Sequence, residues 1–345
     1  MMIETVYKAL RRRFRRLFHI KAHKDSSAIR WGIIGLGNMA QVFADALNGN
    51  SSSILSAVAS RSKDKAVFFA KKNGVKKAFG SYEQMLADDS LKLDVVYIAT
   101  PVKYHYEYVK MCLQARKNVL CEKPIVSTTA ELEELISLAR QQHCFLMEGM
   151  WMKCLPVFRQ ARQMIANGMI GNTELIRVDF YKREIVDFSR SVFNINEGGG
   201  VLMDYGIYAL AFAIDFLDGE PQNLCYEVRK NDKGMDTDWC IMMIRDNIRA
   251  IVNISSNFNS ASKATVIGSG GSIEWDAQFN RTSRIKRFNS LNQLQEEVEF
   301  EYDFDGYEFE IAHVRDCLNK GLKESDVVPL DSSLTALKIV DVLNQ

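Results

Sequence analysis

The stretch Arg30-Trp31-Gly32-Ile33-Ile34-Gly35-Leu36-Gly37-Asn38-Met39-Ala40 decides the fold class of this chain. Its apolar run, residues 31–34, is typical of a buried parallel strand, and a glycine turn and a helical pattern follow at once. In Gly35-x-Gly37-x-x-Ala40 the first glycine permits a tight turn, the second admits a pyrophosphate, and Ala40 lets the helix pack near the strand. The start of that helix offers free N–H groups to phosphates. The stretch therefore predicts a dinucleotide site, although a glycine turn without a ligand fits the same residues.

The residues that follow alternate between strand and helix patterns up to about position 149. Strands are expected at 54–59, 94–99, 118–121 and 145–147, and helices at 63–73, 82–87, 103–115 and 128–142. Such alternation predicts a doubly wound parallel sheet with right-handed crossovers, which makes the fold class α/β. We expect residues 31–150 to form a Rossmann dinucleotide-binding domain.

The pattern changes after Trp151, because strands begin to follow one another directly. Helices are expected at 157–166, 201–217, 307–320 and 333–343, and strands at 175–181, 223–229, 239–244, 249–255, 263–267, 272–275, 283–288 and 296–300. Turns at Asp246-Asn247 and Gly270-Gly271 indicate hairpins. We expect residues 151–345 to form a substrate-binding α/β domain with a large, open, mostly antiparallel sheet. One face of such a sheet is free to pair with another subunit, so a homodimer or homotetramer is expected.

Composition limits the class of protein. The 345 residues suffice for two domains, and 47% hydrophobic and 25% charged residues are usual for a globular chain. No apolar run approaches the roughly 20 residues of a membrane span. The seven cysteines show no CxxC or zinc-like spacing, and their odd number argues against a disulfide framework. We therefore expect a reducing cytoplasm and no metal site.

Residues 1–30 form a leader that differs from the rest in charge. They carry nine Lys or Arg and two acidic residues, whereas the rest of the chain carries 35 basic and 41 acidic residues. The rest of the chain therefore lacks the basic character of a nucleic-acid-binding protein. Apolar residues from Ile3 to Phe18 recur at steps of three and four between arginines, which predicts a basic amphipathic helix. This helix would attach peripherally to the inner membrane surface, pack on its own protein or a partner subunit, or remain a frayed tail. The lack of an uninterrupted apolar run argues against a signal peptide.

The end of the second predicted strand indicates which dinucleotide is bound. NAD sites of this kind usually place an acid about 20 residues after the glycines, to hold the ribose 2′-hydroxyl. Here the sequence reads Ala59-Ser60-Arg61-Ser62. A hydroxyl and a guanidinium suit a 2′-phosphate, so NADP is predicted, with NAD and a solvated surface arginine as the alternative.

Two further motifs have the residue types that proton transfer requires. Cys121-Glu122-Lys123-Pro124 ends a core strand at the edge where ligands bind, so Lys123 can reach a nicotinamide ribose or a substrate hydroxyl. In Gly198-Gly199-Gly200-Val201-Leu202-Met203-Asp204-Tyr205-Gly206-Ile207-Tyr208, Asp204 and Tyr208 lie four residues apart on one helix face. A nearby ammonium would lower the pKa of such a tyrosine. The alternatives are that Lys123 is an ordinary surface lysine and that Tyr208 is an ordinary packed aromatic residue.

Taken in order, these motifs resemble the glucose–fructose oxidoreductase, inositol dehydrogenase and rhizopine-catabolism (Gfo/Idh/MocA) family. The resemblance runs from Trp31 to the C-terminus and includes Ala99-Thr100-Pro101 with His105, Met147-Glu148-Gly149-Met150-Trp151, and Ile170-Gly171. It implies that Lys123 is the catalytic lysine of the Glu-Lys-Pro motif and that Asp204 and Tyr208 belong to an Asp-x-Gly-x-Tyr motif. A motif that ends in Tyr makes the chain most similar to the NADP-linked branch of the family. This branch contains dimeric dihydrodiol dehydrogenase, xylose dehydrogenases and glucose–fructose oxidoreductase.

The resemblance also implies which residues contact ligands. Cofactor contacts are expected from Gly35, Leu36, Gly37, Asn38, Met39, Ala40, Ser60, Arg61, Thr100, Pro101, His105, Glu122 and Lys123, and substrate contacts from Trp151, Lys153 and Asp204. Two departures concern the pocket. Trp151-Met152-Lys153 stands where those relatives often have Trp-Thr-Arg, and Val102 where many members have Asn.

Together these observations predict an NADP-dependent oxidoreductase acting on a carbonyl and secondary-alcohol pair in a sugar, cyclitol or cyclic diol. Tyr208 would be the general acid/base, Lys123 would lower its pKa, and Asp204 would orient Lys123 or bind a substrate hydroxyl. One alternative is a dinucleotide-binding regulatory protein without catalysis. Another is an NAD-dependent glycosidase-like relative, against which the absence of His at position 208 counts.

Overall fold

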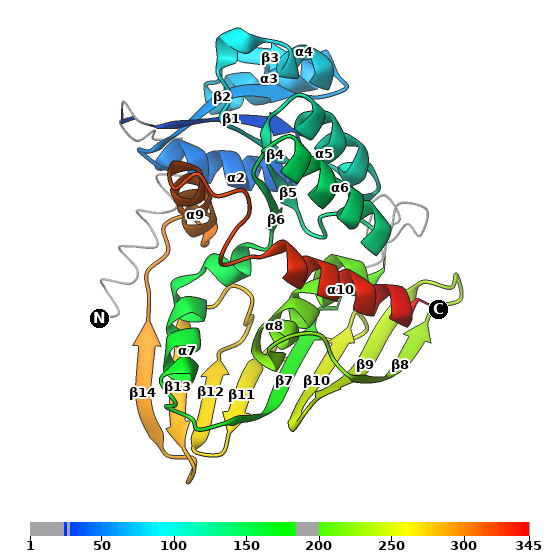
Figure 1. Cartoon of the computed structure of the whole chain (residues 1–345), viewed down its shortest axis with the longest axis vertical. Helices are drawn as coiled ribbons and strands as arrows, with labels where there is room; N and C mark the ends of the chain where they lie inside the picture. The colour runs from blue at the N-terminus through cyan, green and yellow to red at the C-terminus, as the bar shows by residue number, and fades with distance from the viewer. Residues whose placement is uncertain (1–23, 26–27, 184–199, 345) are drawn as a thin grey trace.

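A computed structural model describes residues 24–25, 28–183 and 200–344 (Figure 1). The predicted leader helix, from Ile3 to Phe18, lies outside these residues, as do Gly198 and Gly199 of the glycine-rich motif. The leader hypothesis therefore stays a prediction.

The amino-terminal sheet confirms the predicted doubly wound fold. Its six parallel strands are β1 (Ile29–Ile34), β2 (Ser53–Ala59), β3 (Lys77–Phe79), β4 (Val95–Ile98), β5 (Asn118–Glu122) and β6 (Leu146–Gly149), in the order β3-β2-β1-β4-β5-β6. The order reverses between β1 and β4, and ligands of such sheets bind at that point beyond the carboxyl ends of the strands. Strand β3 was not predicted, because three residues carry too little periodicity.

Local signals explain where the helices of this domain begin and end. The helices are α2 (Asn38–Gly49), α3 (Lys63–Asn73), α4 (Tyr82–Leu86), α5 (His105–Gln114) and α6 (Thr129–Gln141). The Ser62 side chain caps α3, and Gly74 ends it in the left-handed conformation. A capping box of Thr128 and Glu131 starts α6.

The second sheet has eight strands and is antiparallel except where β7 pairs with β10. Its order is β14-β13-β12-β11-β7-β10-β9-β8. The strands are β7 (Thr173–Tyr181), β8 (Asn223–Lys230), β9 (Asp236–Arg245), β10 (Ile248–Ser255), β11 (Ala264–Gly268), β12 (Gly271–Trp275), β13 (Arg284–Asn289) and β14 (Leu294–Glu299). This confirms the predicted open, mostly antiparallel sheet.

Helices cover one face of this sheet (Figure 1). They are α7 (Pro156–Ala166) and α8 (Ile207–Leu217), with α10 (Leu330–Leu343) lying across α8. Helix α8 is apolar almost all round and packs on β7 and β10. Its Phe212 ring also meets Trp275 of β12, with ring centroids 4.8 Å apart. A helix of this composition is stable only when it is buried, so α8 anchors the layer.

The carboxyl-terminal segment returns to the first domain. Helix α9 (Tyr307–Asn319) packs on α2, and the Tyr307 ring stacks on Trp151 at 4.8 Å. The Leu146 N–H donates to the Lys323 carbonyl at 3.1 Å, which places residues 323–324 beside β6. The chain after Trp151 thus holds the two sheets together as well as forming the second one.

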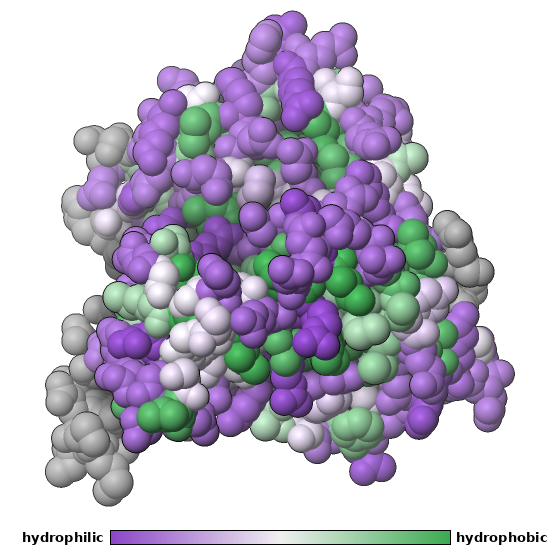
Figure 2. Space-filling view, turned by 60° about the horizontal axis from the view of Figure 1, so that its bottom comes forward, coloured by the Kyte–Doolittle hydropathy of each residue, from purple (hydrophilic) through white to green (hydrophobic). Residues whose placement is uncertain are grey.

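Surface character agrees with a globular chain. Figure 2 shows one face that is largely hydrophilic, with apolar side chains in scattered groups. No helix in the described part of the chain combines the length and the hydrophobicity that a bilayer crossing requires.

Candidate active site

The loop from β1 into α2 has a geometry that only glycine fits at its first position. Gly35 has φ +83°, and a Cβ there would lie 2.7 Å from Thr100 Cγ2. At Gly37 a Cβ would meet nothing within 4 Å, so the backbone faces open space. Gly37 is also the N-cap of α2, and no side chain caps this helix. Exposed backbone at an uncapped helix start fits a pyrophosphate, as predicted.

A cavity of about 290 Å³ adjoins this loop. Its lining includes Leu36, Pro101 and three tyrosines, Tyr82, Tyr104 and Tyr108. Ser60, Arg61 and Lys65 lie on the same wall, and the Arg61 guanidinium carbon is 5.1 Å from the Tyr104 ring centroid. Two cations beside aromatic rings suit a phosphorylated ribose and its adenine. Lys65, in the first turn of α3, was not identified from the sequence.

Thr100 gives an independent sign that a polar ligand belongs in this cavity. Its Oγ1 atom is buried in the cavity wall and has no hydrogen-bond partner among the described residues. Buried hydroxyls are normally paired, because an unpaired one costs about 1–3 kcal/mol. A dinucleotide would supply the missing partner.

His105 does not line either of the two cavities of the site, contrary to the sequence-based expectation. The ring is buried, with Nδ1 2.8 Å from the Pro124 carbonyl oxygen and Nε2 2.7 Å from the Thr100 carbonyl oxygen. It therefore joins the loop after β4 to the loop after β5. The His105 side chain thus helps to position Thr100 instead of facing the cavity that would hold the cofactor.

A second cavity, of about 330 Å³, lies where the two domains meet. It is lined by Met39, Glu122, Lys123, Trp151, Phe180, Tyr181, Lys182, Asp204, Tyr205, Tyr208, Ser262, Gln278, Asn280, Arg281 and Tyr307. The junction of β1 and α2 contributes to both cavities, through the loop residues Gly35–Gly37 in the first and Met39 of the first turn of α2 in the second. The structure therefore brings Lys123, Asp204 and Tyr208 together next to the dinucleotide cavity.

Lys123 lies between the acid and the phenol. Its Nζ is 3.2 Å from Asp204 Oδ1, donates also to the Asp204 carbonyl, and lies 5.0 Å from the centroid of the Tyr208 ring. The Lys123–Pro124 peptide bond is cis. Trp151 Nε1 donates to the Tyr208 hydroxyl at 2.9 Å. Because this bond occupies one acceptor position, the phenolic hydrogen is left for a ligand in the cavity.

The helix that carries Asp204 and Tyr208 is not regular. Residues Leu202–Gly206 form one turn of π-helix before α8 begins at Ile207. A Cβ at Gly206 would lie 2.8 Å from Ile254 Cδ1, so glycine lets this turn pack closely on β10. Single π turns frequently occur at functional sites. The predicted regular helix over 201–217 was therefore wrong in this detail, because hydrophobic spacing does not reveal a wider turn.

Burial sets the protonation state of Tyr208. It raises the pKa of the phenol well above its usual value, repulsion from the Glu122 carboxyl adds to this, and the Trp151 hydrogen bond opposes it. The expectation that Lys123 lowers this pKa is not what the described residues show, since the ammonium lies over the ring face and pairs with Asp204. A phenol that keeps its proton at neutral pH is suited to act as a general acid.

Glu122 lines the second cavity together with Lys123, Asp204 and Tyr208. It is buried, accepts a hydrogen bond of 2.5 Å from the Tyr97 hydroxyl, and accepts the Lys123 N–H at 3.2 Å. Burial raises the pKa of Glu122, which therefore holds its proton more firmly than a surface carboxyl. Its part in cofactor binding stays a prediction.

Lys153 does not reach the substrate cavity, which corrects the predicted contact. It is buried, with Nζ 3.0 Å from Asp215 Oδ1 and 2.6 Å from the Ser332 hydroxyl. Arg162 also pairs with Asp215. Lys153 thus ties the turn after Trp151 to α8 and α10, and Trp151 is the residue of this motif that lines the cavity.

Several lining residues were not identified from the sequence. Lys182 follows β7, Asn280 and Arg281 lie between β12 and β13, and Tyr307 begins α9. These positions carry no shared motif or spacing, since they lie far apart in the sequence and meet only in the folded chain.

The buried acid Glu310 provides a test of the electrostatics of the region around the site. Glu310 is fully buried, and neither carboxyl oxygen has a hydrogen-bond partner among the described residues. Burial raises the pKa of Glu310 well above its usual value, and repulsion from Glu122 and Glu148 adds to this. The folded chain then keeps a proton that the unfolded chain loses above about pH 4.3, so this contribution to stability is lost as pH rises toward the folded-state pKa.

The variant Glu310→Gln should remove this pH dependence. The free energy of unfolding of the variant relative to wild type should increase from pH 5 to pH 8, with a slope of at most about 1.4 kcal/mol per pH unit. Urea titrations at three pH values measure it. Parallel curves for the two proteins would show that Glu310 is not a buried, protonated acid.

Comparison with known proteins agrees with this geometry. Residues 29–150 match the family model described as "Oxidoreductase family, NAD-binding Rossmann fold", and residues 158–274 match the "GFO/IDH/MocA C-terminal domain". Trans-1,2-dihydrobenzene-1,2-diol dehydrogenase of Xenopus tropicalis is 31% identical over 323 residues, which cover 91% of this chain and 96% of that protein. The Homo sapiens enzyme of the same name is 32% identical over 314 residues, with 89% and 93% covered. The resemblance identified from the motifs is confirmed.

Solved structures share the fold. Aldose-aldose oxidoreductase from Caulobacter crescentus aligns with a TM-score of 0.81 at 21% identity, over 92% of this chain and 96% of that chain. A 3-ketoreductase from Actinomadura kijaniata, in complex with NADP, aligns with a TM-score of 0.79 at 23% identity, over 91% and 96%. At these identities the likeness concerns the fold alone.

Proposed function

Because this chain belongs to the GFO/IDH/MocA family of oxidoreductases, we propose that it interconverts a carbonyl and a secondary alcohol in a sugar, cyclitol or cyclic diol, with NADP as cofactor. The observation that supports this most is the meeting of Lys123, Asp204 and Tyr208 in one cavity beside the glycine loop. The relatives named as diol dehydrogenases make a cyclic diol a reasonable first substrate.

The first cavity would hold the cofactor. Gly35 and Gly37 would admit the pyrophosphate, Arg61 and Lys65 would bind the 2′-phosphate, and Thr100 would hydrogen-bond to the dinucleotide. The bound nicotinamide supplies a hydride to the carbonyl carbon in reduction and accepts one from the alcohol in oxidation.

The residues of the second cavity would handle the proton and the developing charge. In reduction, Tyr208 donates its phenolic proton to the substrate oxygen while Trp151 holds the phenol in place. The Lys123 ammonium stabilises negative charge on that oxygen and, after transfer, on the phenol. Asp204 keeps Lys123 on the cavity side, since it accepts hydrogen bonds from Nζ through both its carboxylate and its carbonyl. In oxidation the same groups work in reverse.

A dehydrogenase and reductase screen tests the proposed function. Purified protein is assayed with NADPH and NADP, and with NADH and NAD, over sugars, cyclitols, trans-diols and dicarbonyls. Turnover that is faster with the phosphorylated cofactor supports the proposal. Tight NADPH binding without turnover of any compound would instead support the regulatory alternative.

Arg61→Ala should change cofactor preference. Losing a charge-assisted bond of about 1.5–3 kcal/mol should raise KM for NADPH about 10- to 100-fold and leave KM for NADH nearly unchanged. Lys65→Ala is the matched comparison on the same wall and should have the same sign. Steady-state kinetics with both cofactors measure this. Equal losses for NADPH and NADH would mean that Arg61 does not recognise the phosphate.

Two finer points remain proposals. The sheet face opposite α8 carries no helix of the described chain, and we propose that it pairs with a second copy in a homodimer, which light scattering tests (Figure 1). We also propose that the basic leader contacts an anionic membrane surface. Deleting residues 1–30 should abolish liposome binding without changing kinetics, and equal binding before and after deletion would remove this proposal.

A further inference from the structure

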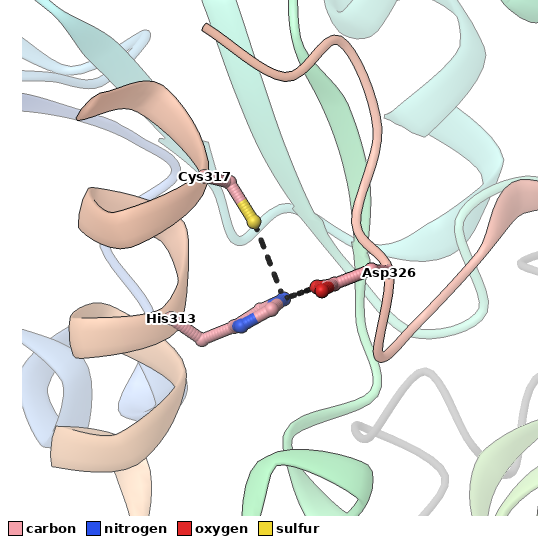
Figure 3. A group of neighbouring side chains, drawn as sticks. All are labelled: His313, Cys317 and Asp326. Atoms are coloured by element: carbon pink, nitrogen blue, oxygen red, sulfur yellow. Dashed lines mark hydrogen bonds and ion pairs between the residues drawn. The ribbon is translucent and has the colours of Figure 1, made fainter. Parts of the chain in front are cut away.

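Three metal-ligand side chains converge beside the carboxyl-terminal half of α9 (Figure 3). None of the three lines either cavity of the site. His313 Nε2 lies 3.4 Å from Cys317 Sγ and 3.7 Å from Asp326 Oδ1, and the three ligand atoms all lie within 4.8 Å of one another. His313 and Cys317 are four residues apart on one helix face, and Asp326 comes from the loop that leads into α10. We propose that His313, Cys317 and Asp326 bind a zinc ion.

The donor set selects the metal. Imidazole nitrogen, thiolate sulfur and carboxylate oxygen are the ligands of zinc, whereas magnesium and calcium prefer oxygen alone. The Asp326 side chain is 66% exposed, so an ion can enter from solvent and keep water as its fourth ligand. Two buried ligands and one exposed ligand thus give both a fixed site and an entry path.

Hydrogen bonds around Ser325 indicate which nitrogen of His313 can ligate. The Ser325 hydroxyl oxygen accepts the N–H groups of Val327 at 3.1 Å and Val328 at 2.7 Å. With both acceptor positions used, its hydrogen points to His313 Nε2, 2.7 Å away. In the tautomer that accepts this hydrogen, Nε2 carries a lone pair near Cys317 and Asp326, and a metal ion would replace the serine as its partner.

Burial affects the two buried ligands in opposite directions. Burial raises the pKa of Cys317 to about 11, so the thiol is protonated at neutral pH and loses its proton when a metal binds. Burial also lowers the pKa of His313, which leaves the imidazole neutral and ready to ligate. The other charged groups around the pair are Asp316, Lys320, Asp326 and Arg159.

The positive charge of Arg159 should weaken zinc binding, so replacing this residue should strengthen it. Its Nη2 lies 3.4 Å from His313 Nδ1, where a metal-bound histidine normally donates to an acceptor. A guanidinium is a donor and a cation, so it disfavours both the ligating tautomer and the ion. Arg159 is exposed on α7, and Arg159→Gln should keep the fold while it tightens zinc binding about 10-fold or more.

Zinc chloride titration of the full chain tests the proposal. The background carries Cys225→Ser and Cys240→Ser, because these two thiols are exposed and could bind zinc nonspecifically. Calorimetry should give one zinc per chain, and cobalt should give a thiolate-to-metal charge-transfer band. His313→Ala and Cys317→Ser should each weaken binding at least 10-fold, and the exposed Asp326→Asn, which leaves the core intact, should weaken it as well.

Stability gives a readout that does not depend on activity. The site would join α9 to the segment beside β6, so zinc should raise Tm, and the rise should vanish in Cys317→Ser. Zinc stoichiometry and affinity that are unchanged in His313→Ala, Cys317→Ser and Asp326→Asn would overturn the proposal. So would the absence of tighter binding in Arg159→Gln. Neither result bears on the oxidoreductase reaction, which the cofactor screen tests separately.

Discussion

Tyr208→Phe should lower kcat for carbonyl reduction about 10²-fold or more, because positioned acid–base catalysis contributes about 10²- to 10⁴-fold. The variant keeps the ring that packs beside Lys123 and Trp151 but lacks the proton that the substrate oxygen needs. KM for NADPH should change little, since Tyr208 does not line the dinucleotide cavity. Single-turnover kinetics of NADPH oxidation measure the effect.

Tyr205→Phe is the matched control for this prediction. Tyr205 lines the same cavity, but its hydroxyl contacts the Lys182 carbonyl at 3.4 Å and not Trp151. Its kcat should stay near the wild-type value. In the wild type, the raised pKa of Tyr208 should keep the reduction rate flat from neutral pH upward, because the acid holds its proton there. A Tyr208→Phe enzyme with wild-type turnover would show that another group supplies the proton.

Lys123→Met should lower kcat about 10²- to 10³-fold, the usual cost of removing one preorganised group that stabilises charge in the transition state. Methionine fills similar space but cannot stabilise an oxygen anion or pair with Asp204. The carboxylate of Asp204 would then face the substrate oxygen and oppose the same charge. The loss should fall on kcat more than on the Kd for NADPH, which fluorescence titration measures.

The Lys182→Met variant distinguishes stabilisation of the transition state by Lys123 from a general effect of positive charge in the cavity. Lys182 is a second lysine on the cavity wall, yet it lies near Tyr205, with Nζ 5.9 Å from that ring centroid. Its replacement should alter KM for the substrate while kcat falls far less than in Lys123→Met. Equal kcat losses in the two variants would argue that Lys123 acts only through the overall charge of the cavity.

The sequence located the site more reliably than it located individual side chains. His105 and Lys153 both stand within motifs that end at the site, yet both side chains turn away from it. The partner that holds Lys153 is Asp215, which is distant in the sequence and shares no pattern with it. Adjacency along the chain therefore identified the motif, whereas the direction of each side chain depended on charges brought close by folding.

The sequence by itself determined the features that depend on short-range backbone chemistry. The tight turn at Gly35, the caps of α3 and α6, and the alternation of strands and helices each rest on steric or hydrogen-bonding preferences within a few residues. From these the two sheets and the glycine loop followed. The pattern also placed Lys123 at the end of a core strand and Asp204 and Tyr208 on one helix face, and the resemblance matched all three to motifs of the family.

The tertiary structure decided what depends on distance through space. Burial raises the pKa of Tyr208, although the sequence alone predicted only that Lys123 and Asp204 lie near it. Folding also brings Asp326 to His313 and Cys317, although the cysteine spacing predicted no metal site. Desolvation and Coulomb interactions act between atoms that the chain separates, so only the packed arrangement fixes them.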